Sequence, residues 1–245
     1  MLRFIFKSKE IRGKNKEIRT FWIYALGEFF LVFLGILIAL QVDNWNQDRR
    51  LRKQEDTMLE ELLENLKSDL ADVDLNIRLQ NSAMASSRII LGFLDGEGPW
   101  HDSLATHFVA LTSGTVFFEN ISSYESLKSL GIDLISNDSI RLKMTHLYSV
   151  TYDYVNIMEE RALTHIFEVM NASMAKHLRM IEFPRCYFPL DASKLRLSNE
   201  FRHNLLSSIT FNRYMLGLYT DIKEDLADLI QDIEEELGLE PEATN

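Results

Sequence analysis

The chain has 245 residues and a formal net charge of −11 at neutral pH, with 26 basic and 37 acidic side chains. An acidic balance of this size repels nucleic acid, so we expect no nucleic-acid partner. The single cysteine, Cys186, excludes a disulfide within the chain. The fold must therefore be held together by packing and hydrogen bonds.

The first predicted element is a transmembrane helix over residues 21–42, which follows a basic N-terminus at 1–20. This segment is almost entirely apolar, and about 20 residues suffice for a helix to cross the ~30 Å hydrocarbon core. Trp22 and Tyr24 at one end and Trp45 beyond the other are typical of interfacial aromatic belts. Because no small-x-small cleavage pattern is present, we predict an uncleaved signal anchor that sits in the lipid bilayer.

The basic residues on either side of the span predict its orientation. Seven lie within residues 1–20 and four lie within 49–53. The more basic flank of a span tends to stay in the cytoplasm. We therefore predict a single-pass inner-membrane protein with its N-terminus inside and its C-terminal domain outside the cytoplasm.

A polar helical stalk over 43–57, a helical bundle over 58–239 and a frayed tail over 240–245 are predicted beyond the span. Proline and glycine are scarce, at 4 and 10 residues, which favours long helices. The first helix of the bundle has apolar residues in alternating steps of four and three, at Leu59, Leu63, Leu66, Leu70, Val73 and Ile77. This heptad seam fits the inner face of a bundle within one chain, which we favour, or an intermolecular coiled coil.

Short elements are predicted next. A helix of about three turns covers 104–111, and 115–118 is an extended segment without a visible partner strand. Ser122 or Ser123 is expected to cap a short helix that ends at Gly131.

Two long helices complete the predicted bundle. One begins at Asn137 or Asp138 and runs to about Met180, with an inner face at Ile140, Met144, Leu147, Tyr154, Met158, Ala162, Ile166 and Val169. Two prolines then favour a non-helical loop at 183–191, and the last helix begins near Ser198. The predicted fold class is all-α, with one N-terminal transmembrane helix and a bundle of three long helices plus short connecting helices.

Two stretches resemble the signatures of a known group of proteins. The first, YALGEFFLVFLGILIALQVDNWN at 24–46, contains a Gly-Glu pair, the run Gly-Ile-Leu-Ile-Ala-Leu-Gln and the triplet Asn-Trp-Asn. The second is SYESLKSLGIDLISNDSIR at 123–141. Together they resemble an uncharacterised bacterial family of single-span membrane proteins with a domain of unknown function, and the resemblance extends over the whole chain. Asp43 departs from the family pattern, which has an amide there. The resemblance implies a single span and implies no activity.

Three residues of the span are candidate functional or packing residues. Glu28 lies seven residues inside Phe21, or roughly 10 Å deep at 1.5 Å per residue, where a carboxylate is costly. It either serves a function, which includes an oligomer contact, or reaches back to the headgroups. Gly35 and Ala39 are four residues apart and form a small-xxx-small pair that suits close helix packing in a homo-oligomer.

A possible ligand or partner corner lies at the break around Gly131. Tyr124, Glu125, Asn137 and Arg141 flank the end of one helix and the start of the next, so their side chains are candidates to converge there. The alternative, which we favour, is that these residues are helix caps and a turn.

No motif in the sequence predicts catalysis, a cofactor or a metal site. The six histidines show neither a His-Glu-x-x-His pattern nor a pair of Glu-x-x-His motifs. Ser173 and Lys176 fit Ser-x-x-Lys, but its companion motifs are missing, so we expect both on a helix surface.

We therefore expect a non-enzymatic, membrane-anchored interaction or scaffold protein that forms homo-oligomers and docks an unidentified protein partner. Two alternatives remain open. One is an extracytoplasmic sensor that binds a small ligand between helices and signals through a partner. The other is a subunit of an ion-coupled membrane complex that uses Glu28.

Overall fold

The computed structural model describes residues 2–182 and 185–239, with side chains described from Phe21 onward except for Ile23. The predicted all-α class is confirmed. The elements are α1 (Leu2–Asp95), α2 (Leu104–His107), the 3₁₀ helix η1 (Phe108–Thr112), α3 (Ser122–Leu130), the 3₁₀ helix η2 (Ile132–Leu134), α4 (Asp138–His146), the π-helix η3 (Leu147–Thr151), α5 (Tyr152–Thr164), the π-helix η4 (His165–Met170), α6 (Asn171–His177), β1 (Leu178–Ile181), β2 (Cys186–Pro189), α7 (Ala192–Leu197) and α8 (Asn199–Leu237). The chain divides into two compact units, with the boundary between Gln54 and Glu55.

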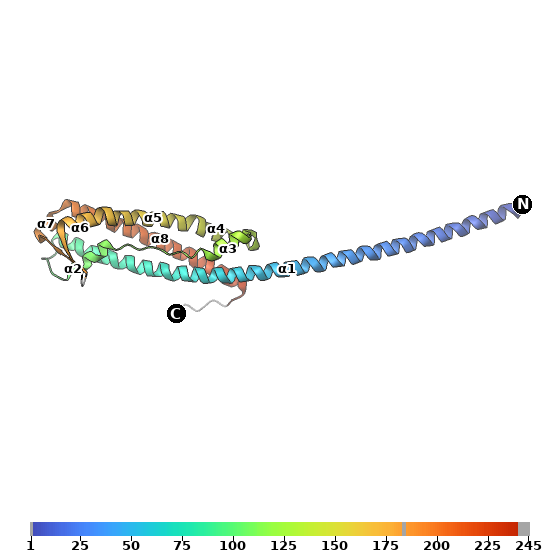
Figure 1. Ribbon diagram of the computed structural model, residues 1–245, viewed down its shortest axis with the longest axis horizontal. Helices are drawn as coiled ribbons and strands as arrows, with labels where there is room; N and C mark the ends of the chain where they lie inside the picture. The colour runs from blue at the N-terminus through green and yellow to red at the C-terminus, as the bar shows by residue number, and fades with distance from the viewer. Residues whose placement is uncertain (1, 183–184, 240–245) are drawn as a thin grey trace. The chain divides into compact units, whose positions relative to one another are not determined.

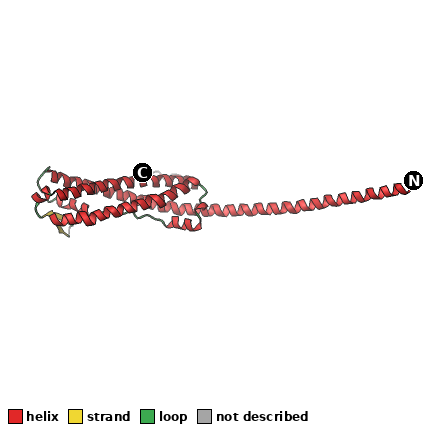
Figure 2. Ribbon diagram, turned by 90° about the horizontal axis from the view of Figure 1, so that it is seen from above, coloured by secondary structure: helices red, strands yellow, loops and turns green. Residues whose placement is uncertain are grey.

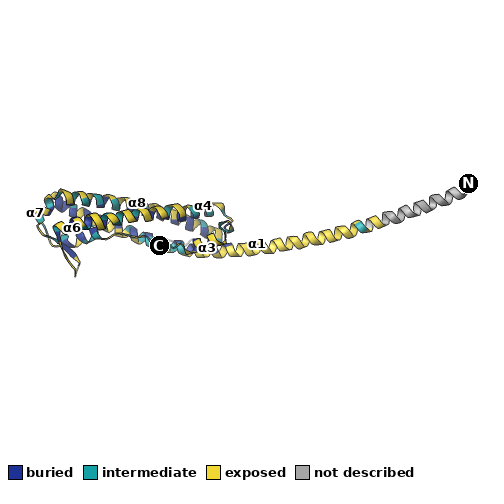
Figure 3. Ribbon diagram, turned by 45° about the horizontal axis from the view of Figure 1, so that its top comes forward, coloured by how far each residue is buried: buried dark blue, intermediate teal, exposed yellow. Residues whose placement is uncertain are grey.

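The first unit holds the apolar part of α1. Within the described residues, α1 contains one window that is long and apolar enough to cross a membrane, and none of that window is buried. Apart from half-buried Ala25, its described side chains are exposed, as Figure 3 shows for this part of α1. A surface of this kind suits an apolar surrounding such as the core of a lipid bilayer, since exposed apolar area in water is unfavourable.

The second unit is a helical bundle in which α1, α5 and α8 lie side by side (Figure 1). The heptad seam of α1 faces the interior, since Leu59, Leu66 and Val73 are buried among side chains of α4, α5 and α8. The inner-face interpretation of the seam is therefore confirmed. Burial of each such leucine contributes about 1.5–3 kcal/mol, so this row carries much of the stability of the bundle.

A second hydrophobic cluster closes the far end of the bundle. Phe93 of α1, Met170 of η4 and Phe201 of α8 are among its buried members. The segment predicted as a plain loop at 183–191 instead contributes an antiparallel hairpin, in which Leu178 pairs with Pro189 and Ile181 with Cys186. Figure 2 shows the strands at this end of the bundle. Pro189 is tolerated because the sheet has only two strands, so its missing N–H costs no further ladder bond.

The long helix predicted over 137–180 is present but irregular, and it ends at His177, because residues 178–181 form β1. Asn137 caps it as predicted, accepting hydrogen bonds from the backbone N–H groups of Ser139 and Ile140. The π-helices η3 and η4 interrupt the α-helical ladder and shift which side chains face inward. Tyr154 and Val169, predicted on the inner face, are 46% and 38% exposed. That part of the prediction is wrong, because a constant period of 3.6 residues does not hold across π segments.

The start of α3 also differs from the prediction. Its N-cap residue is Ile121, and neither Ser122 nor Ser123 caps the helix. Ser123 instead donates to the Glu61 carbonyl of α1, 3.1 Å away, because it faces the bundle. The predicted end at Gly131 is confirmed, and Gly131 has a φ of +109°.

Alanine at two glycines should change stability in opposite directions. Gly131→Ala forces an L side chain into a positive φ and should lower the free energy of unfolding by about 1–3 kcal/mol. Gly217→Ala, in the middle of α8 with open space around it, should raise that free energy by about 0.5–1 kcal/mol. Urea unfolding of both variants measures the difference, and equal effects would contradict the assigned backbone conformations.

Candidate functional site: a buried carboxylate clamp and an open groove

Residues 113–121 form no helix or strand, and we call them the clamped segment because side chains hold their backbone. Figure 1 shows this stretch, between η1 and α3, running along the bundle. The predicted extended segment at 115–118 lies within it. Asn76 of α1 donates to the Val116 carbonyl at 3.1 Å. Asp72 accepts from the Phe118 N–H at 3.0 Å, and Asp69 accepts from the Asn120 N–H at 2.9 Å.

The α1 residues that make these bonds form one polar stripe beside the heptad seam. Its members are Asn65, Asp69, Asp72, Asn76 and Gln80, spaced by four or three residues and therefore on one helix face. Gln80 extends the contact by donating to the Thr115 hydroxyl at 2.8 Å. This stripe replaces the partner strand that the clamped segment lacks.

The opposite side of the clamped segment is held by Glu159 of α5. Its Oε1 accepts from the Phe117 N–H at 2.9 Å and from the Tyr219 hydroxyl of α8 at 2.6 Å. Asp69 has a similar pair of donors, since its second oxygen accepts from the Tyr152 hydroxyl at 2.7 Å. Asp69 is 1% exposed and Glu159 is 4% exposed, so both carboxyl groups are core residues.

Burial raises the pKa of both carboxyl groups. The pKa of Asp69 rises to about 6, because desolvation outweighs the hydrogen bonds from Tyr152 and Asn120 that lower it. Desolvation likewise raises the pKa of Glu159 against the bonds from Tyr219 and Phe117. Both oxygens of Asp69 and Oε1 of Glu159 accept from donors of the chain itself, so the arrangement is suited to holding the clamped segment.

Removal of the Tyr219 hydroxyl should weaken this clamp. Tyr219→Phe deprives Glu159 and Thr115 of a buried partner and should lower the free energy of unfolding by about 1.5–3 kcal/mol. The matched control is Tyr154→Phe, whose exposed hydroxyl bonds Tyr214 at the surface and whose loss should cost less than about 0.5 kcal/mol. Urea unfolding compares the two, and equal costs would show that the Glu159 bond is unimportant.

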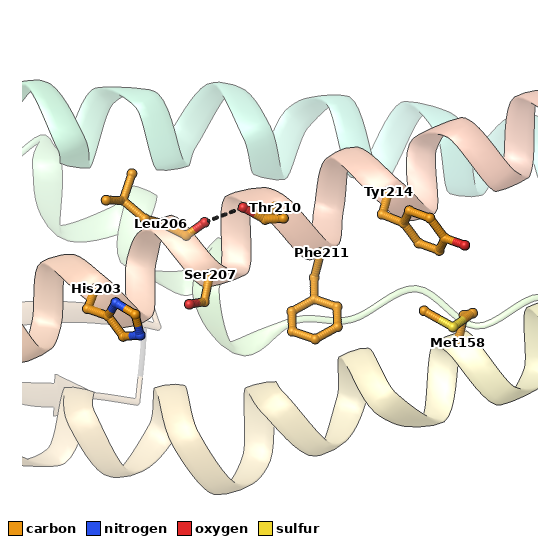
Figure 4. Close-up of a pocket in the computed structure, with 7 residues that line it drawn as sticks. All are labelled: Met158, His203, Leu206, Ser207, Thr210, Phe211 and Tyr214. Atoms are coloured by element: carbon orange, nitrogen blue, oxygen red, sulfur yellow. Dashed lines mark hydrogen bonds between the residues drawn. The ribbon is translucent and has the colours of Figure 1, made fainter.

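A groove of about 400 Å³ opens between α5 and α8, and Figure 4 shows its lining. It is lined by Met158, His203, Leu206, Ser207, Thr210, Phe211 and Tyr214. His165 of η4 lies beside it, with its Nε2 3.0 Å from the Ser208 hydroxyl and its ring 5.1 Å from that of Phe211. Burial lowers the pKa of His165, and the nearby His203 lowers it further. The volume falls within the range of small-molecule sites.

The span candidates lie on an exposed helix surface. Glu28, Gly35 and Ala39 are all exposed in α1, and a side chain added at Gly35 would meet nothing within 4 Å. The space beside Gly35 suits a close helix contact. The roles of these three residues remain predictions.

The four residues of the predicted corner make local contacts, and Tyr124 and Glu125 share Lys128, whose ammonium lies 5.5 Å from the Tyr124 ring centroid. Tyr124 is buried and stacks on Tyr148, with ring centroids 4.4 Å apart. Glu125 forms an exposed ion pair with Lys128 at 2.8 Å. Asn137 caps α4, and Arg141 donates to the Ile135 carbonyl and pairs with Asp138. These contacts are those expected of caps and a turn.

Other candidate chemistry is dispersed. Ser173 is buried and not on the helix surface as predicted, because it faces the second hydrophobic cluster, while Lys176 is exposed and pairs with Glu200 at 2.7 Å. The two side chains thus point in different directions. Cys186 is a buried free thiol. Among the described residues, no group of three His, Cys, Asp or Glu side chains could hold a metal ion.

The sequence interpretation missed Asp69, Glu159 and Tyr219. An acidic residue in a helical sequence is normally expected to face solvent, so neither Asp69 nor Glu159, considered alone, indicates burial. The available signal was the spacing of the polar stripe on α1, which continues for 16 residues, from Asn65 to Gln80, beside the seam.

Comparison with known proteins places the chain in a family. Neither curated proteins nor solved structures give a match. A family model described as a family of unknown function (DUF6090) matches residues 28–184, which is more than half of the chain. The match includes the stretch 123–141 and begins inside the stretch 24–46, but it is shorter than the whole-chain resemblance, and α8 lies beyond it. The chain therefore belongs to the DUF6090 family of unknown function.

Proposed function

We propose that this protein is a membrane-anchored, non-enzymatic interaction protein that forms homo-oligomers through the outward face of its bundle. The observation that carries the proposal is a row of exposed apolar side chains along α4, η3 and α5. We call it the outer stripe; its members are Leu142, Val150, Tyr154 and Ile157. Contiguous exposed apolar side chains mark interaction surfaces more often than isolated ones do.

Two further features support this role. The apolar window of α1 is suited to an anchor, and chains anchored in one bilayer meet at a raised effective concentration, which favours weak contacts. The buried carboxyl groups of Asp69 and Glu159 are engaged in holding the clamped segment, so these two acids have a structural task.

Cysteine crosslinking in native membranes tests the assembly. In a full-length chain with Cys186→Ala, Val150→Cys should form disulfide-linked dimers on mild oxidation. The control is Ala227→Cys, an exposed position on the flank of α8 that faces α1. We expect several-fold more dimer at position 150 than at 227, because only the outer stripe faces the second copy.

A second variant distinguishes a specific contact between two chains from random collisions in the membrane. Adding Ile157→Glu to the Val150→Cys chain places a charge in the outer stripe and should reduce dimer to the level of the control. Equal crosslinking at 150 and 227, or crosslinking that survives Ile157→Glu, would refute assembly through this face.

A further inference from the structure

We propose that the groove between α5 and α8 binds a single-chain amphiphile with a carboxylate head group. The groove has a polar end and an apolar end, as Figure 4 shows. His203 and Ser207 lie at the polar end, near Leu206. Phe211, Met158 and Tyr214 lie toward the apolar end, where the Tyr214 hydroxyl is hydrogen-bonded to Tyr154. A ligand that is polar at one end and apolar along the rest matches this order.

The lining of α8 forms a single track along the helix. His203, Ser207, Phe211 and Tyr214 follow one another at steps of four and three residues, so they share a face. From His203 to Tyr214 the track is roughly 16 Å long at 1.5 Å per residue, which is comparable to an extended dodecyl chain. Met158 lies across from this track on α5.

The polar side chains at one end of the groove suit a carboxylate head group. None of its lining residues is a carboxylate, although acids outnumber bases in the chain. The imidazole of His203 and the hydroxyl of Ser207 form no hydrogen bond with another described residue, so both are available as donors to a carboxylate.

A second groove differs from the first because carboxylates line it. On another flank of α5, a groove of about 410 Å³ is lined by Val116, Leu163 and Phe167 together with Glu159, Glu160 and Glu168. A carboxylate ligand would be repelled there and accepted beside His203, whereas a cationic amphiphile would show the reverse preference. The two grooves of one chain thus provide an internal comparison.

The test uses the full chain in phosphatidylcholine nanodiscs and a photoreactive dodecanoate that carries a diazirine on its chain. After illumination, peptide mass spectrometry maps the labelled residues. We expect labelling within 203–214 and near Met158, competed by dodecanoate and not by dodecyltrimethylammonium. Labelling confined to residues 21–42 would show only partition into lipid and would overturn the proposal.

Introducing a carboxylate at each of two positions provides the matched variants. His203→Glu should reduce labelling of the groove about tenfold, because a carboxylate then faces the ligand head group. Arg213→Glu, an equally exposed position on α8 that does not line the groove, should leave labelling nearly unchanged. Equal losses in both variants, or no loss in His203→Glu with the helical circular dichroism intact, would refute the site. The site does not depend on the outer stripe, so Val150→Cys crosslinking is expected to be unchanged in both variants.

Discussion

Asp69→Asn is expected to remove a pH dependence of about 3 kcal/mol from the free energy of unfolding. The pKa of Asp69 is raised from 3.8 to about 6 in the folded chain, and one pKa unit corresponds to about 1.4 kcal/mol. Because the folded state holds this proton more tightly than the unfolded state, the stabilisation is complete below pH 3.8. It is lost as the pH rises to about 6, and it stays absent above that.

Urea unfolding at several pH values between 4 and 7 measures this effect as the difference between the wild type and Asp69→Asn. The pKa of Glu159 is raised in the same direction, so Glu159→Gln should also flatten the profile. Asp153→Asn, at an exposed position of α5, is the control and should run parallel to the wild type. If the free energy of unfolding rose with pH in the wild type and not in Asp69→Asn, the pKa of Asp69 would be lower in the folded chain than in the unfolded chain. That result would contradict the prediction.

Deletion of residues 21–42 should move the protein from the membrane fraction to the soluble fraction almost completely. This stretch contains the apolar helix surface, and roughly 20 such residues hold a chain in the bilayer far more firmly than a peripheral contact does. The melting temperature of the bundle should be unchanged, because both hydrophobic clusters lie beyond Gln54.

A second variant tests the mechanism of anchoring. Replacement of 21–42 by an unrelated leucine-rich helix of equal length should restore membrane retention, whereas Leu34→Arg should weaken insertion by about 2.5–3.5 kcal/mol. Retention of the deleted chain after a carbonate wash would show that the bundle itself holds the membrane.

The regular helices were predictable because their chemistry is local. Leu59, Leu66 and Val73 repeat at heptad spacing and are buried, and α8 begins after Ser198, whose hydroxyl accepts from the Phe201 N–H. A repeat or a cap is encoded within a few neighbouring residues, so one sequence is enough to find it.

The remaining features depend on residues that are distant in the sequence. The outward position of Tyr154 follows from the π-helix η3, whose i→i+5 hydrogen bonds break the period of 3.6 residues. Asp69 and Glu159 are buried because backbone N–H groups of the clamped segment meet them, at separations of 51 and 42 residues. The hairpin at 178–189 lacks the usual two-residue turn signal.

The clamped segment also constrains the order in which the chain becomes structured during synthesis. Its polar stripe on α1 precedes it, but Tyr219, whose hydroxyl meets Thr115, is translated 104 residues later. At 5–20 residues per second, roughly 5 to 20 seconds separate the two on the ribosome. Through that interval Phe117 lacks the α8 side chains that complete its hydrophobic cluster. The clamped segment is therefore incompletely packed until α8 has been synthesised.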